Sequence, residues 1–300
     1  MLTREDKRTQ VVAHLVCILF TALAILPFIL MIVISFTDNN WASVNGYTYF
    51  PKAWSLEAYS YIGLQWGKIG RAYLMTILVT VAGTVTNLVL SSTFAYAISH
   101  RNIPGMKLLN MMLVLTMLFS GGIVASYYVY VKYFHIKDTI WALIVPNYLM
   151  NAFHVILIRN YYTSSIPPAL TESAKIDGAS EFTVFTRIIL PLSKPIIATV
   201  GLMVALGYWN DWLNGIYYLT ERGGSKLYTI QIVLNNINDN IQVLKANAGE
   251  LAKMGTVIPQ LPSTTIRMAI AVVGILPVMI AYPFFQQYFV KGITQGAVKE

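Results

Sequence analysis

Long apolar stretches are the feature that most constrains how this chain can fold. A transmembrane helix needs about 20 consecutive apolar residues to cross the hydrocarbon core of a bilayer. Hydrophobic residues fill 56% of the 300 positions and charged residues 11%, whereas a soluble domain usually carries roughly 25% charge. The sequence therefore predicts an all-α, polytopic membrane protein with six transmembrane helices, at about residues 11–36, 73–99, 108–131, 139–158, 196–219 and 264–285.

Basic residues beside the apolar runs predict the orientation of the chain. Lys and Arg collect on the cytoplasmic side of membrane proteins. The residues that carry this signal precede the first or the third span, and they are Arg4, Lys7, Arg8, Arg101 and Lys107. We therefore expect a single transmembrane domain over residues 1–300, with cytoplasmic termini, a cytoplasmic loop at 159–195 and external loops at 37–71 and 220–263.

The segment from Pro167 to Pro195 is polar, yet it is patterned like a folded element. Its first prolines are tolerated in a first helical turn, and helix formers continue to Ile176. Gly178 suits the left-handed position after a helix, Ser180 can cap a second helix, and Pro191 is expected to stop it. The apolar face of that second helix is predicted to hold Phe182, Phe185 and Ile189. The pattern predicts a helix-turn-helix that lies at a membrane surface and docks on a partner.

Glu172-Ser173-Ala174, Gly178 and Ile189-Leu190-Pro191 form a spaced pattern within this segment. The pattern resembles the EAA loop of ATP-driven importer permeases, in which E-A-A is followed by a glycine and then by I-x-L-P or a close variant. Ser173 replaces the middle alanine, which is a change between small residues. The resemblance implies that the loop forms coupling helices in a cleft of a cytoplasmic ATPase. The implied coupling residues are Glu172, Ser173, Ala174, Asp177, Gly178, Leu190 and Pro191.

Two further stretches resemble sugar permeases of this family. The C-terminal segment has Lys291, Gly292, Gly296, Val298 and Lys299 in the pattern of tails that reach towards the ATPase dimer. This implies ATPase contacts by Gly292, Gly296 and Lys299. The whole chain resembles the smaller permease subunit of carbohydrate-type ATP-binding-cassette (ABC) importers of the maltose-transporter kind, which have the type I importer fold. The FSGGI break at 119–123 and the YWNDW element at 208–212 resemble the branch that handles larger oligosaccharides.

The resemblance implies a multi-pass protein of the bacterial cell membrane that works by alternating access with several partners. These are a second homologous permease subunit, two ATP-binding-cassette ATPase subunits, an extracellular solute-binding protein and an oligosaccharide substrate. ATP and Mg²⁺ are expected in the partner ATPase. No cofactor and no metal are expected in this chain.

No catalytic motif is found in the sequence. Gly223-Gly224-Ser225-Lys226 is the nearest match to a phosphate-binding loop, and it lacks the required spacing. Cys17 is the only cysteine, so the sequence holds no disulfide framework and no metal-ligand spacing. The net charge of +8 comes without a long basic run, and cytoplasmic loops explain it more simply than nucleic acid does. We therefore expect neither enzymatic activity nor nucleic-acid binding, and ATP hydrolysis in another chain.

The polar and aromatic cluster in the predicted fifth span has more than one interpretation. Flat rings stack on sugars, and Asn and Asp accept hydrogen bonds from hydroxyls, so the cluster can line a substrate path. It can also be an interfacial aromatic belt at a polar helix end. The alternative function is an ion-coupled secondary transporter of a small polar solute, for which Asp211 is the candidate acid within the membrane. The substrate-path hypothesis names Tyr208, Trp209, Asn210, Asp211 and Trp212.

Overall fold

The computed structural model describes residues 4–100, 103–246 and 263–297, and it describes side chains in these ranges except at 4–8, 244–245, 263 and 284–297. The described residues are helical apart from loops and one isolated bridge between Thr37 and Trp54. The prediction of an all-α protein is therefore confirmed. The chain divides into two compact units, which are Met1–Ile69 with Leu234–Pro277 and Gly70–Val233 with Val278–Glu300.

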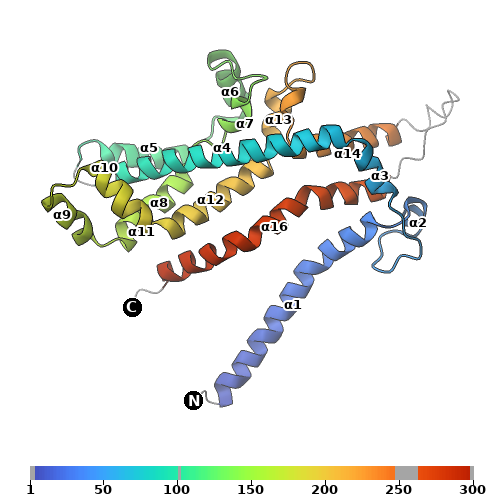
Figure 1. The fold of residues 1–300 in the computed structure, drawn as a ribbon, viewed down its shortest axis with the longest axis horizontal. Coiled ribbons are helices and arrows are strands. Elements are labelled where there is room, and N and C mark those ends of the chain that lie inside the picture. Colours follow the sequence, from blue (N-terminus) through green and yellow to red (C-terminus); the bar gives the residue numbers. More distant parts are fainter. Residues whose placement is uncertain (1–3, 101–102, 247–262, 298–300) are drawn as a thin grey trace. The chain divides into compact units, whose positions relative to one another are not determined.

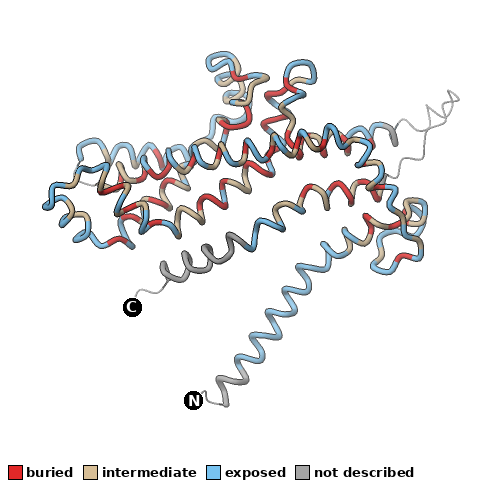
Figure 2. Tube along the Cα trace, in the orientation of Figure 1, coloured by how far each residue is buried: buried red, intermediate tan, exposed pale blue. Residues whose placement is uncertain are grey.

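The first unit starts with α1 (Arg4–Ser35), whose apolar stretch from Thr9 is largely exposed along its length (Figure 2). Such a surface is typical of a helix that lipid or a partner covers. α2 (Asn39–Asn45) and α3 (Glu57–Leu64) follow in the predicted external loop 37–71. The hydroxyls of Ser35 and Tyr59, 2.8 Å apart, join the end of α1 to α3.

The second unit is built along α4 (Trp66–Ser99), which enters it at Gly70 (Figure 1). The other helices of this unit are shorter. They are α5 (Met106–Leu118), α6 (Gly122–Tyr128), η1 (Val129–Tyr133), α7 (Trp141–Ile144), α8 (Ala152–Ser165), α9 (Pro168–Ile176), α10 (Glu181–Val184), η2 (Phe185–Ile189), α11 (Leu190–Leu192), α12 (Lys194–Trp209), α13 (Leu213–Tyr218) and η3 (Ser225–Leu227). Besides α4, two more helices have residues in both units, α14 (Ile230–Ala246) and α16 (Ser263–Ala297).

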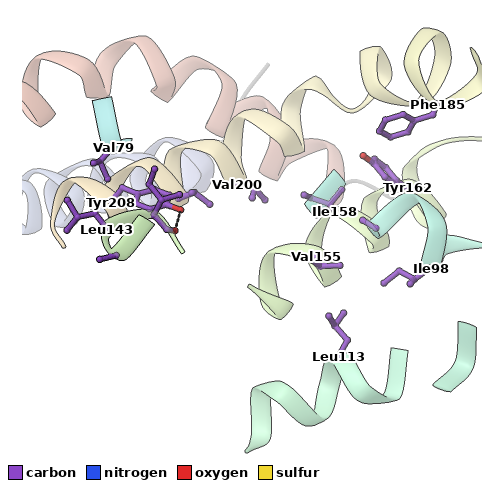
Figure 3. Packing of buried hydrophobic residues seen from close by; sticks show 14 of the residues in the cluster. Val79, Ile98, Leu113, Leu143, Val155, Ile158, Tyr162, Phe185, Val200 and Tyr208 are labelled. Carbon is purple, nitrogen blue, oxygen red and sulfur yellow. Dashed lines mark hydrogen bonds between the residues drawn. The ribbon is translucent and has the colours of Figure 1, made fainter. Parts of the chain in front are cut away.

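An apolar core joins α4, α5, α7, α8, η2 and α12 of the second unit. In lipid, close packing rather than the removal of apolar surface from water holds helices together. Residues labelled in Figure 3 show the core, and they are Val79, Ile98, Leu113, Leu143, Val155, Ile158, Tyr162, Phe185, Val200 and Tyr208. This core fixes the helices that lead into and out of the polar segment 159–195.

Three of the described helices are long and apolar enough to cross a membrane, and they fall on the predicted first, second and sixth spans. These stretches are Thr9–Ser35, Trp66–Ser99 and Thr264–Pro283. Two helix pairs pass the same test together but are bent, by 118° between α5 and Gly122–Tyr133 and by 78° between Glu181–Leu192 and α12. The described residues thus hold three candidate spans, or five if each bent pair crosses once.

The bend between α5 and α6 lies at the Ser-Gly-Gly sequence that predicted a break in the third span. Gly122 has φ of 73°, in the left-handed region that glycine occupies without strain. Because the bend is 118°, residues 108–131 do not form one straight helix. Only the part up to Leu118 follows the axis of α5.

The predicted fourth span, residues 139–158, is not one helix, since α7 and α8 are separated by seven residues, 145–151. Pro146 has no amide hydrogen for a helical bond, and Asn147 has φ of 67°. Asn151 then starts α8, because its side-chain oxygen accepts a hydrogen bond of 2.9 Å from the N–H of Phe153. The prediction of a single helix here was therefore wrong.

Side chains of α4, α12 and α13 bond the backbone of this interrupted segment. The donors and the carbonyls that accept from them are Tyr208 to Ile144 (2.8 Å), Asn214 to Pro146 (3.1 Å) and Asn87 to Tyr148 (2.6 Å). Non-helical backbone survives within a membrane only where the protein or a water-filled cavity satisfies its polar groups. These three bonds satisfy three of the backbone carbonyls at the break.

Two other predicted boundaries differ from the structure. The predicted fifth span, 196–219, is interrupted, because α12 ends at Trp209 and α13 begins at Leu213. Pro191 does not stop its helix, which continues to Leu192. The π-helix η2 ends just before Leu190, so that the proline comes directly after the π-helical turn, as the second residue of α11.

Part of the predicted external loop 220–263 is helical, because it contains η3 and α14. Five of the described residues of α14 are buried, namely Ile230, Ile232, Leu234, Ile237 and Ile241, and those at 230, 234, 237 and 241 recur with helical spacing. The polar residues between them masked this signal in the sequence. Residues 247–262 of the loop lie outside the described residues.

We predict that Gly83→Ala destabilises the second unit. A Cβ at Gly83 would lie 2.4 Å from the ring of Tyr208, whose hydroxyl is already bonded to Ile144. The ring must shift, which costs about 1–3 kcal/mol. We expect the melting temperature of the purified protein in detergent to fall by about 2–6 °C.

Gly67→Ala is the matched control, since Gly67 lies in the same helix and no neighbouring atom lies within 4 Å of the position that a Cβ would take there. It should leave the melting temperature unchanged or raise it slightly, because alanine is the better helix former. Equal melting temperatures for the two variants would contradict the packing role of Gly83.

Candidate functional site

The strongest candidate site is the hairpin, which we define as α9, the turn 177–180 and α10. Gly178 has φ of 84° and donates its N–H to the carbonyl of Lys175 at 3.1 Å. The N–H of Ala179 reaches back to the carbonyl of Ala174 at 2.9 Å. This pair of bonds is the Schellman closure of a helix, which requires a left-handed residue. The predicted role of Gly178 in ending the first helix is confirmed.

The second helix of the hairpin starts as predicted, but its apolar face differs. The side-chain oxygen of Ser180 accepts a hydrogen bond of 3.2 Å from the N–H of Thr183, which caps α10. Phe185 and Ile189 are buried, whereas Phe182 is 75% exposed. Phe182 lies in the first turn of α10, before the core contacts begin at Val184. Of the three residues predicted for the apolar face, Phe182 is therefore the one that is not buried.

An open pocket of about 480 Å³ lies between α9 and the segment η2–α11. Four predicted coupling residues line it, namely Ser173, Ala174, Asp177 and Pro191. The other lining residues are Leu170, Arg187, Ile188 and Leu192. The structure therefore brings the two ends of the EAA-like pattern together across one groove.

The remaining predicted coupling residues lie outside the pocket lining. Glu172 is exposed on α9, and no hydrogen bond or ion pair of its carboxylate is found among the described residues. Gly178 is exposed at the turn, and Leu190 is half-buried at the start of α11. Glu172 is thus free to meet a partner, while Gly178 acts through the backbone.

Glu181 is a residue of the hairpin that the sequence did not single out. Its carboxylate pairs with the ammonium of Lys175 on α9 at 2.5 Å and accepts a hydrogen bond from the hydroxyl of Tyr96 on α4 at 2.7 Å. The imidazole of His100, just after α4, lies 3.8 Å away. The hydrogen bond from Lys175 and then that from Tyr96 lower the pKa of Glu181 below its usual range. The carboxylate is therefore held in its ionised form.

The residues predicted for the substrate path fall into buried and exposed members. Tyr208 is 1% exposed and packs against Tyr148, with ring centroids 5.1 Å apart. Trp209 is buried, and its ring lies 6.4 Å from that of Tyr73. Asn210 and Trp212 are exposed. Of the five predicted residues, only these two present their side chains at the surface of the described chain.

Asp211 is buried and lies in the break between α12 and α13, where it bonds the backbone of α13. Its carboxylate accepts a hydrogen bond of 3.2 Å from the N–H of Asn214. The Asn214 side chain bonds in turn to the carbonyl of Pro146 and, at 3.3 Å, to the side chain of Asn147. The polar residues of the predicted cluster thus connect two interrupted helices of the second unit.

The structure describes only part of the C-terminal segment that was predicted to contact the ATPase. Gly292 and Gly296 lie in α16, and Lys299 lies outside the described residues. Among the described residues, no three His, Cys, Asp or Glu side chains gather as metal ligands would.

Known proteins with similar sequences include sugar-transport permeases. The polygalacturonan/rhamnogalacturonan transport system permease protein YtcP of Bacillus subtilis (strain 168) is 39% identical over 282 residues, which are 94% of this chain and 95% of that protein. The Protein LplC of the same organism is 38% identical and covers 93% of this chain and 90% of its own length. The trehalose/maltose transport system permease protein MalG of Thermococcus litoralis is 27% identical, over 99% of both chains.

A solved structure and a family model agree with these relatives. A chain in the crystal structure of a bacterial ABC transporter involved in the import of the acidic polysaccharide alginate matches with a TM-score of 0.78 and 28% identity, covering 96% of this chain and 99% of that one. The fold is therefore that of a type I ABC importer permease. The model of the family described as the binding-protein-dependent transport system inner membrane component matches residues 3–295, and the chain belongs to this family of membrane permeases.

Proposed function

We propose that this chain is one of two permease subunits that form the pore of an ATP-driven oligosaccharide importer. A binding protein outside the cell delivers the sugar, and two ATPase subunits inside the cell close on ATP. The hairpin converts that closure into movement of the spans. The observation that carries the proposal is the hairpin itself, in which Gly178 joins two helices at the spacing of the EAA-like pattern.

The surface of the hairpin supports docking on an ATPase. Ile176 is 85% exposed beside the turn, and Phe182 is exposed on the other helix. Large exposed apolar side chains rimmed by polar ones are typical of protein interaction sites. Glu172 and Asp177 add carboxylates to the same surface. A partner in contact with this surface can bias two conformations of the permease, because it holds the hairpin differently in each.

We further propose six membrane crossings with both termini and the hairpin in the cytoplasm. The three continuous spans, the bent pair of α5 with Gly122–Tyr133, and α12 would account for five crossings, and α7 with α8 would form the other one. Glu181–Leu192, before the 78° bend, would then stay on the cytoplasmic side. The basic residues before the first and third spans support this orientation. The C-terminal residues Gly292, Gly296 and Lys299 then lie on the side where the ATPase binds.

ATP and Mg²⁺ belong to the partner subunits in this proposal, because the chain lacks a phosphate-binding loop sequence. The second wall of the pore comes from a second, homologous permease. The names of the relatives support an oligosaccharide as the substrate, and those named for polygalacturonan/rhamnogalacturonan and alginate favour an acidic one. The relatives favour this function over an ion-coupled carrier.

Gly178→Val tests the coupling role of the hairpin. A side chain in the left-handed region costs about 1–2 kcal/mol, and a β-branched one is among the least tolerated there. No atom lies within 4 Å of the Cβ position, so the effect comes from the backbone of the turn and not from a clash. We expect normal membrane insertion and loss of substrate-stimulated ATPase activity in reconstituted vesicles.

Gly178→Asn is the matched control, since asparagine adopts the left-handed conformation far more readily than valine. It should retain most of the stimulation. The coupling role would be refuted if substrate stimulated the ATPase activity equally in Gly178→Val and in the wild type.

Trp212→Ala and Asp211→Ala separate the two interpretations of the YWNDW element. Trp212 is exposed, so we expect its removal to raise the KM of sugar transport about fivefold, as for loss of a stacked ring, at an unchanged melting temperature.

Removal of the Asp211 carboxylate leaves the buried N–H of Asn214 without its acceptor and should destabilise the protein by about 1–3 kcal/mol. Transport kinetics and thermal unfolding in detergent measure the two effects. A normal KM for Trp212→Ala would exclude Trp212 from the substrate path.

A further inference from the structure

Three parts of the second unit meet at the Glu181 carboxylate. Glu181 itself begins α10, Lys175 comes from the last turn of α9, and Tyr96 comes from the last turn of α4. The contacts are those given above, at 2.5 Å from Lys175 and 2.7 Å from Tyr96. The ring of Tyr96 also packs on Phe185, with centroids 5.0 Å apart. The polar contacts therefore join the hairpin to this end of α4, and the apolar contact joins η2, which follows the hairpin directly, to the same residue of α4.

The rest of α4 carries contacts to the interrupted helices. Gly83 lies against the ring of Tyr208, and Asn87 bonds the carbonyl of Tyr148. Near the other end of the helix, the hydroxyl of Thr76 accepts a hydrogen bond of 2.8 Å from the N–H of Ile230, at the start of α14. Because α4 is continuous from Trp66 to Ser99, a displacement of its hairpin end is passed along to these contacts.

We propose that Glu181 is a positioning residue that couples the hairpin to α4, so that movement of the hairpin displaces α4 and the helix breaks packed against it. This inference rests on the proposed function, in which an ATPase moves the hairpin. Glu181 and its donors form one cluster, the Glu181 latch, which consists of Glu181, Lys175, Tyr96 and His100.

The energetics of the latch fit a role in coupling rather than in folding. The Glu181 side chain is 59% exposed, and exposed ion pairs contribute little to stability. An ATPase that covers the hairpin removes water from the latch, and the same charges then interact more strongly. The latch is thus weak in the isolated permease and strengthens when the partner that applies the force is bound.

A simpler role for Glu181 is that of an acid in the first turn of a helix. Such an acid interacts favourably with the helix dipole without any contact to another helix. Tyr96→Phe distinguishes the two roles, because it removes the hydroxyl that bonds Glu181 and leaves the carboxylate, Lys175 and the helix dipole in place. A dipole role predicts no effect of this substitution.

The experiment uses the complete transporter, purified with its ATPase subunits, second permease and binding protein and reconstituted in vesicles. The variants are Tyr96→Phe, Glu181→Ala, the double variant and Glu181→Gln. The readouts are basal ATPase activity, ATPase activity stimulated by loaded binding protein, sugar transported per ATP hydrolysed, and the amount of assembled complex. The matched control is the pair Tyr61→Phe and Glu57→Gln on α3, which are the same side-chain changes. Among the hydrogen bonds of the described residues, none joins the Tyr61 hydroxyl to the Glu57 carboxylate.

We expect Tyr96→Phe and Glu181→Ala each to lower sugar transported per ATP about fivefold, with normal assembly and basal activity. The double variant should lose no more than Glu181→Ala alone, because both changes break the same contact. Glu181→Gln, which keeps an acceptor for the Tyr96 hydroxyl, should recover part of the loss. The control pair should behave like the wild type.

Three results would each overturn the role of Glu181. The first is that Tyr96→Phe transports as much sugar per ATP as the wild type, and the second is that the losses add in the double variant. The third is that both single variants fail to assemble. Failure of the proposed function is a separate result. In that case the wild-type complex itself would show no ATPase activity that loaded binding protein stimulates.

Discussion

Backbone polar groups that leave a helix inside a bilayer must find partners within the protein, and the second unit is organised around this constraint. The helix interruption between α7 and α8 exposes carbonyls that a continuous helix would have satisfied. Side chains from α4, α12 and α13 donate to three of them, at Ile144, Pro146 and Tyr148. Each of these bonds joins segments that are at least 61 residues apart in the chain. The bonds at the break therefore join distant segments of the unit, in addition to the apolar core.

The sequence predicted the helical class and the continuous spans because long apolar runs are a local signal. It also predicted the turn at Gly178, since a glycine between helix formers and a capping serine has few other conformations. The break at 145–151 was missed because Pro146 alone often only kinks a transmembrane helix. Its backbone is stabilised by Tyr208 and Asn87, and such distant partners cannot be recognised from the sequence of the break itself.

In the candidate site, too, the sequence identified the residues that follow a local pattern and missed those whose partners are distant in the chain. The EAA-like pattern was found from spacing, and the structure brings Ser173 and Pro191 to one pocket. Glu181 was missed because in the sequence it is an ordinary first-turn acid, while its partner Tyr96 is 85 residues away. The substrate-path hypothesis named Asp211, whose carboxylate accepts a hydrogen bond from the backbone N–H of Asn214. Residues that join elements are chemically similar to residues that bind ligands, and only their contacts tell them apart.

We propose that this permease works with separate ATPase subunits through the hairpin. The most direct test is to purify the tagged chain from detergent-solubilised native membranes and assay the ATPase activity of the eluate with and without binding protein and acidic oligosaccharide. We expect a second permease and a phosphate-binding-loop ATPase to co-elute, with hydrolysis that the loaded binding protein stimulates. Purification of the chain alone, with no ATPase and no stimulated hydrolysis, would contradict the account.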